Sequence, residues 1–316
     1  MTTAVSAARA QAAVPDPTLG SCQVFPNPPV SLSPSAPSLP DQSAWNQDIS
    51  KAPRDPRSDA YISYINAHGG NSLHPDFGSP RVYGIPFTVV GPGQPRLPVT
   101  YTAYGEESDP GPFPVPAGAP IEGGRRGDGD RHTLAVDTST CTLYELYRAF
   151  YRPRPSPHWN ADSGAVWDLD SPDLRPAGWT SADAAGLPIF PGLVRYDEVA
   201  AGRLEHAIRV TFESTRDAYI LPATHCAGDT ARAAAPPMGL RLRLEAGYGL
   251  GHFSGHARTI AEAMKRYGLI VADNGSNWYF SGSSDRRWDD DNLNQLKRIP
   301  GSAFEVVKSA ARAHRC

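Results

Sequence analysis

The chain has 316 residues, of which 40% are hydrophobic and 20% charged, and its formal net charge is -3. This composition is typical of a globular protein, and no apolar run is long enough to span a membrane. Because no basic excess attracts a phosphate backbone, we expect neither a nucleic-acid partner nor membrane insertion. The 32 prolines and 29 glycines predict many turns and short strands.

Residues 1–40 are rich in Pro, Ala and Ser and show no periodicity, so we expect a disordered tail there. The small, Ala-rich stretch 4–13 resembles the end of a secretion signal, although a plain tail explains it equally well. We expect order to begin near Trp45 and residues 41–316 to form a single β-rich domain.

A short helix is predicted over 59–67, and a second one follows Ser254, with Ile260, Met264 and Tyr267 on one face. Between and after them, short apolar runs separated by turn residues predict strands. The fold class that follows is mostly β: an antiparallel β-sandwich or jelly roll, concanavalin-like or similar, with one packed helix. The predicted strands cover 81–90, 97–104, 132–136, 143–150, 165–169, 206–212, 218–221, 240–245, 269–272, 278–280 and 303–307.

The four cysteines are dispersed and form no CxxC pair, which disfavours a thiolate metal site and favours disulfides in a secreted protein. Three pairings are possible. We favour Cys22–Cys316 with Cys141–Cys226, because chain termini often lie close together. Four free thiols in a cytosolic protein are the alternative.

The region 129–150 reads as two strands joined by a tight polar turn. Apolar and polar residues alternate in both strands, so we expect one buried and one wet face. The wet face would carry Arg131, His132, Glu145 and Tyr147, a set that suits a polar, ring-shaped ligand such as a sugar.

Glycoside hydrolysis usually needs two carboxyl groups across a sugar cleft. Among the acids near strands or long loops, which include Glu122, we favour Glu145 with Asp183 or Asp273 as the catalytic pair. Each has a simpler explanation: Glu145 as a solvated strand residue, Asp183 as a helix cap and Asp273 as part of a turn.

Three histidines, His132, His206 and His225, lie in or beside predicted strands and could form a proton-transfer set. No HxH or HExxH spacing ties any two of them together, so no metal site is predicted and unrelated positions are the alternative.

Aromatic and basic side chains would form the sugar-binding surface: Trp167 and Trp179 by stacking, Arg131 and Tyr147 by polar contacts. Core packing is the competing explanation for the tryptophans. No cofactor motif is present. The acidic strings 128–130 and 289–292 could hold a structural calcium ion, although neither matches a twelve-residue calcium loop.

Several strings, taken together, resemble a family of secreted, mostly uncharacterised bacterial proteins. The resemblance covers most of residues 45–307 and implies secretion and a single folded unit. It assigns no activity and no catalytic residue. The strings are LHPDFG (73–78), ESDPGP (107–112), GDRH (129–132), PMGLRL (237–242) and ADNGS (272–276).

These observations favour a secreted glycoside hydrolase that acts on an extracellular polysaccharide or oligosaccharide through a carboxylate pair. A polysaccharide lyase with a His or Tyr base, drawing on His132, Tyr147, Arg131 or His225, is the alternative among enzymes. A non-catalytic glycan-binding protein is the alternative from another class, because it would use the same aromatic residues.

Overall fold

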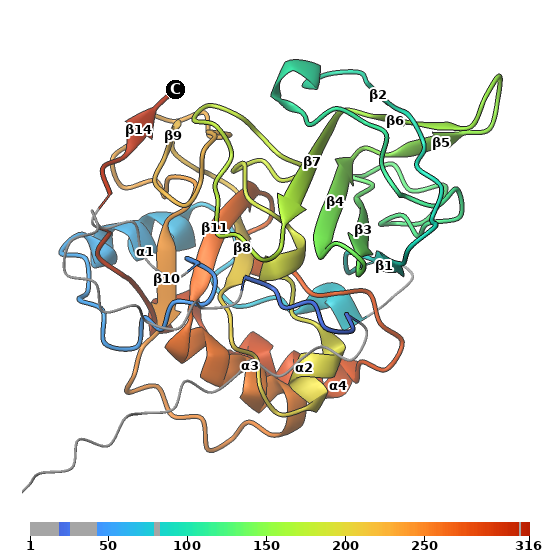
Figure 1. Cartoon of the computed structure of the whole chain (residues 1–316). Coiled ribbons are helices and arrows are strands. Elements are labelled where there is room, and N and C mark those ends of the chain that lie inside the picture. The colour runs from blue at the N-terminus through green and yellow to red at the C-terminus, as the bar shows by residue number, and fades with distance from the viewer. Residues whose placement is uncertain (1–18, 26–42, 79–82, 310) are drawn as a thin grey trace, which may run out of the picture.

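The computed structural model describes residues 19–25, 43–78, 83–309 and 311–316 (Figure 1). The chain is mostly strands in several mixed sheets with few helices, 25% strand and 17% helix, which confirms the β-rich class. The helices are α1 (Ser58–Ala67), α2 (Tyr196–Ala200), α3 (Gly255–Arg266) and α4 (Asp290–Leu293). The strands are β1 (Phe87–Val90), β2 (Val99–Tyr101), β3 (Thr133–Asp137), β4 (Thr142–Tyr147), β5 (Phe150–Arg152), β6 (His158–Ala161), β7 (Ser163–Asp168), β8 (Ile208–Phe212), β9 (Ala218–Tyr219), β10 (Arg241–Leu244), β11 (Leu269–Asn274), β12 (Tyr279–Phe280), β13 (Phe304–Val306) and β14 (His314–Arg315).

The largest sheet has the order β12-β8-β11-β10-β13 and forms the middle of the molecule (Figure 1). Its strands β8 and β11 run parallel, whereas the other pairs are antiparallel, so the sheet is mixed rather than purely antiparallel. Helix α3 packs beside β10, and its buried residues include Ile260 and Met264. Together with the buried Tyr267, they are the apolar face predicted from the sequence.

A second sheet has the order β1-β3-β4-β7, and its central strands β3 and β4 are buried on both faces. Leu134, Val136 and Leu143 belong to the main core, whereas Ala135 and Tyr144 face a smaller core shared with the sheet β2-β6-β5. The expected hairpin is therefore present, but its expected wet face is covered. Period-two alternation cannot distinguish a wet face from one that a second sheet covers.

The cysteines pair as Cys22–Cys141 and Cys226–Cys316, so the favoured pairing was wrong. Phe25 donates its backbone N–H to Leu169 at 2.7 Å, which holds the N-terminal segment beside the turn that carries Cys141. At the other end, β14 pairs with β9 and places Cys316 near Cys226.

Part of the segment for which we expected a tail lies in the core: Leu19, Cys22 and Phe25 are buried. The rest of 1–40 lies outside the described residues.

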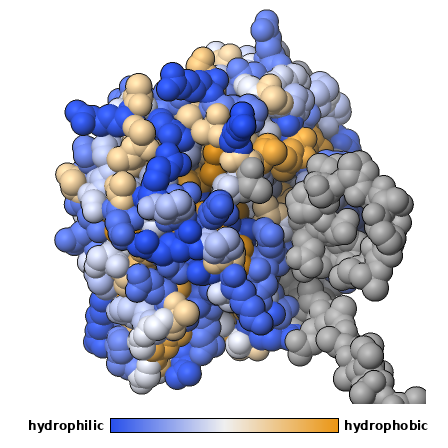
Figure 2. Space-filling view, turned by 90° about the vertical axis from the view of Figure 1, so that its left-hand side faces the viewer, coloured by the Kyte–Doolittle hydropathy of each residue, from blue (hydrophilic) through white to orange (hydrophobic). Residues whose placement is uncertain are grey.

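Two strands were not predicted, β6 and β14, and the run 143–150 divides into β4 and β5 at Arg148, whose φ is 50°. Within the described ranges, no helix is long and apolar enough to cross a membrane. Hydrophilic residues predominate on the face shown in Figure 2.

Candidate functional site

A pocket of about 210 Å³ lies where the carboxyl ends of β8 and β11 meet the residues that precede β3. This volume is below the roughly 300 Å³ at which drug-sized pockets begin, so it suits a group the size of one sugar residue. The lining includes the charged side chains Asp76, Glu122, Asp130, His132, Arg209 and Asp273.

A bulge in β11 places Asp273 at the pocket. Val271 lies opposite Val210 and Asp273 lies opposite Thr211, which leaves Ala272 as an extra residue. Bulges re-aim side chains, and they recur beside active sites. The carbonyl of Ala272 accepts the N–H of Ala185 at 3.0 Å, so the bulge also anchors the loop that contains Asp183.

Asp183 and Arg209 form a buried ion pair behind the pocket. The Arg209 Nε and Nη2 atoms donate to the two Asp183 oxygens at 3.0 and 2.7 Å, and Nη1 donates to Ser281 Oγ at 2.5 Å. Arg209 Nη2 also lies 3.5 Å from Asp273 Oδ2. Asp183 is thus fully engaged, while its partner arginine reaches the carboxylate that opens to the pocket.

His132 is buried, and both of its ring nitrogens face acceptors. Nδ1 lies 2.6 Å from Glu122 Oε2, and Nε2 lies 3.0 Å from the carbonyl oxygen of Ala182. Burial opposes the imidazolium form, but the Glu122 carboxylate outweighs it and raises the pKa of His132 to about 9. Both nitrogens then donate, so His132 has no lone pair with which to accept a proton.

The contact between Glu122 and His132 lowers the pKa of Glu122, whereas it raises that of His132. Burial favours the neutral acid, but the charge and hydrogen bonds of His132 outweigh it and hold the pKa of Glu122 below its usual value. Glu122 therefore faces the pocket as an ionised carboxylate.

Asp273 has the reverse electrostatic environment. Burial and the negative charge of Asp183 raise the pKa of Asp273 to about 7, against the attraction of Arg209. The pocket thus contains one carboxyl group that retains its proton up to neutral pH and one that does not. Such a separation of pKa values distinguishes acid from base in many enzymes.

Arg131 positions the loop that carries Glu122 and Asp130. It is buried, its Nη1 donates to the carbonyl oxygens of Gly124, Arg125 and Gly127, and its guanidinium lies 4.2 Å from the centre of the Phe150 ring. We predicted a sugar contact for this residue, but the structure engages its guanidinium in holding the loop. Tyr147 lies behind His132, with their ring centres 5.7 Å apart.

An aromatic wall lies on another side of the pocket. The rings of Tyr279 and His74 stack at 4.3 Å, and Asp76 lies 3.3 Å from His74 Nδ1 and 2.7 Å from Lys297 Nζ. Tyr83 also lines the pocket and is exposed. Such faces suit the apolar side of a sugar ring.

Glu145, our first catalytic candidate, lies inside the protein and does not line the pocket. Its side chain is fully buried and accepts the N–H groups of Ile189 and Phe190 and the indole N–H of Trp167. Burial raises the pKa of Glu145 to about 7, although those backbone bonds oppose the rise. The residue holds a turn of 3₁₀ helix, Phe190–Gly192, against β4.

His206 and His225 do not converge with His132. The ring of His206 contacts the carbonyl of Ala207 and Glu198 Oε2, and that of His225 contacts the carbonyl of Ala184. Neither histidine lines the pocket. The structure therefore brings together His132, Asp183 and Asp273, but not the other candidates.

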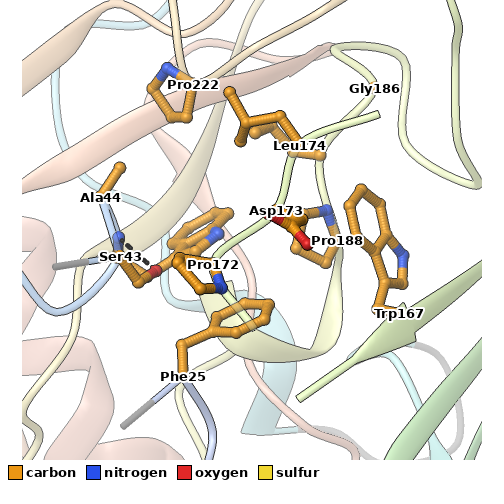
Figure 3. Close-up of a pocket in the computed structure, with 12 residues that line it drawn as sticks. Phe25, Ser43, Ala44, Trp167, Pro172, Asp173, Leu174, Gly186, Pro188 and Pro222 are labelled. Atoms are coloured by element: carbon orange, nitrogen blue, oxygen red, sulfur yellow. Dashed lines mark hydrogen bonds between the residues drawn. The ribbon is translucent and has the colours of Figure 1, made fainter. Parts of the chain in front are cut away.

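The two candidate tryptophans lie elsewhere, and the ring centres of Trp167 and Trp179 lie 5.6 and 5.5 Å from the Arg175 guanidinium carbon. Trp167 borders a proline-lined crevice with Phe25, Leu174 and Pro222 (Figure 3). This crevice has a volume of about 20 Å³, enough for about one water molecule. Trp167 also lines a second pocket of about 190 Å³ with Asp109, Asp173 and Arg175, whose lining does not include Asp273 or Glu122. A sugar contact of Trp167 in that second pocket stays a prediction.

Three side chains at the pocket could hold a metal ion. Ligand atoms of Glu122, Asp130 and His132 lie within 4.8 Å of one another. The direct Glu122–His132 hydrogen bond occupies the Nδ1 position that a metal would need. In the other predicted calcium string, Asp289 caps α4 by accepting the N–H groups of Asp291 and Asn292.

Comparisons with protein-family models, curated proteins and solved structures gave no match. Sequence reasoning gave no role to Arg209 or Asp76, and it considered Asp130 only as a calcium ligand. An arginine between apolar residues in the run 207–210 was the available signal, since a buried charge needs a partner.

Proposed function

We propose that the protein is a secreted glycoside hydrolase in which Asp273 donates the proton and Glu122 is the base or nucleophile. The observation that carries the proposal is that both carboxyl groups line one pocket while their pKa values are shifted in opposite directions. Asp273 would protonate the glycosidic oxygen. The ionised Glu122 would attack the sugar or activate water.

The protein's own groups hold this pair in place. Arg209 lies beside Asp273 and is fixed by Asp183, while His132 donates to Glu122 and is fixed by the carbonyl of Ala182. Each reacting carboxyl therefore has a supporting contact from a buried residue, which limits the motion of the pair. Two disulfides support export to an oxidising compartment.

A lyase is less well supported by the same groups. Both ring nitrogens of His132 lie against hydrogen-bond acceptors, so His132 has no free lone pair with which to take a proton from the substrate. Burial and the charge of Asp130 raise the pKa of Tyr147, so less of its phenolate form is available to act as a base near neutral pH.

For the fold, we propose a sandwich in which the sheet β1-β3-β4-β7 lies between the two hydrophobic cores. The jelly-roll strand order stays a prediction.

Incubation of the purified protein with a polysaccharide panel tests the proposal. We expect new reducing ends without new ultraviolet absorbance, and a loss of about 10²- to 10⁴-fold in Asp273→Asn. Asp128→Asn, a substitution of an exposed acid on the pocket loop, is the matched control. Ultraviolet absorbance would favour the lyase, and retention on a glycan without product would favour a binding protein.

A further inference from the structure

We propose that the pocket recognises a saccharide with a positively charged amino group, such as a glucosamine residue, and that Asp130 binds its ammonium group. This inference names the substrate class of the proposed hydrolase and rests on that function.

The cations at the pocket are already paired. All three Arg209 nitrogens donate to Asp183 or Ser281, and both His132 nitrogens face Glu122 or Ala182. The nearby Lys297 is paired with Asp76. A uronate or phosphate group would therefore meet no unpaired cation among the described lining residues, and it would be repelled by the carboxylates.

Asp130 has the opposite status. Its carboxylate lines the pocket, is exposed, and makes no hydrogen bond among the residues that the structure describes. The charged His132 lies within 4.8 Å of it but donates both of its ring N–H groups to Glu122 and the carbonyl of Ala182, so it attracts Asp130 without bonding to it. Its charge nevertheless reaches the pocket interior, because it contributes to raising the pKa of Asp273. An ammonium group is the complement of such a carboxylate, since it supplies both charge and three hydrogen-bond donors.

The aromatic wall adds a second reason for a cationic sugar. Tyr279, stacked on His74, and the exposed Tyr83 both line the pocket that Asp130 borders. A sugar ring can lie on an aromatic face, and an ammonium group close to that face gains a cation–π interaction. A neutral sugar would gain only the first of these contacts.

Titration calorimetry with three oligosaccharides of equal length tests the proposal: free-amine glucosamine oligomers, their N-acetylated counterparts and oligogalacturonate. The buffer contains EDTA and little salt. We expect the amine oligomer to bind about tenfold more tightly than the acetylated one. Asp130→Asn should remove that preference, whereas the neighbouring control Asp128→Asn should retain it. The preference should weaken as salt is added.

Equal affinity for the amine and acetylated oligomers, tighter binding of oligogalacturonate, or an unchanged preference in Asp130→Asn would overturn the proposal. So would a Mn²⁺ or Zn²⁺ binding signal that depends on Asp130 without any amine preference, because a metal would then account for the free carboxylate. Reducing ends measured in parallel separate the two hypotheses. Asp130-dependent binding without cleavage contradicts the hydrolase alone, and Asp273-dependent cleavage without amine preference contradicts the inference alone.

Discussion

Glu145 and Asp273 are two carboxyl groups that burial affects in the same way and that the fold places in opposite settings. Burial raises the pKa of each to about 7. Glu145 is enclosed by N–H donors from Ile189, Phe190 and Trp167, whereas Asp273 opens to the pocket beside Arg209. A raised pKa therefore marks burial, and access to a pocket is what can turn the retained proton into a catalytic one.

The largest expected difference between these two carboxyl groups is in turnover. Asp273→Asn should lower kcat by about 10³-fold, equivalent to about 4 kcal/mol, because it removes the proton donor. Glu145→Gln should stay within about twofold of wild type at a temperature where both are folded, since Glu145 does not reach the pocket. Steady-state kinetics on the substrate identified by the panel measure both. A Glu145→Gln enzyme that is folded but inactive would reverse the assignment.

Asp183 extends the comparison to a third carboxylate, one whose charge the protein neutralises directly. Asp183→Asn leaves the buried Arg209 charge without its bidentate partner and should lower the free energy of unfolding by about 3 to 5 kcal/mol. Asp197→Asn is the matched control, because Asp197 pairs with the half-exposed Arg287 and should cost at most about 1 kcal/mol. Chemical denaturation measures both values, and equal losses would contradict the role given to burial.

The smallest expected effect concerns the pH dependence of stability. The folded-state pKa of Glu145 is raised from 4.5 to about 7, so its contribution to stability is fully present below pH 4.5 and is lost as the pH rises to about 7. The loss is about 3 kcal/mol, since each pKa unit corresponds to about 1.4 kcal/mol. In Glu145→Gln the fall in unfolding free energy over this range should be shallower by that amount. An unchanged slope would show that Glu145 is not the group that titrates.

Most elements of the fold could be predicted from local pattern. The helix after Ser254 and the strands around 206–212 and 269–272 are where apolar periodicity placed them. The jelly-roll order and the single-domain boundary stay predictions. Sequence could not show that a second sheet covers the hairpin at 129–150, because alternation is the same for a wet face and a face packed on another core.

The candidate site was only partly predictable for a similar reason. Asp273 and His132 could be named as candidates because each lies at one end of a predicted strand. Glu145 was the first candidate because an acid in an apolar strand looks the same whether it faces a pocket or a row of backbone N–H groups. The cysteine pairing failed likewise, because spacing does not show which loops lie side by side.

The β-rich class, the positions of most strands and the chemistry of the available side chains follow from local propensity and residue type, so they could be predicted before the fold was known. Tertiary structure alone decided which acids meet. The bulge at Ala272, the loop carbonyl of Ala182 and the Asp183–Arg209 pair bring Asp273, His132 and Glu122 into one pocket from segments up to 151 residues apart. Long-range contacts fix distance, exposure and charge, and those three quantities separate a reacting carboxylate from a structural one.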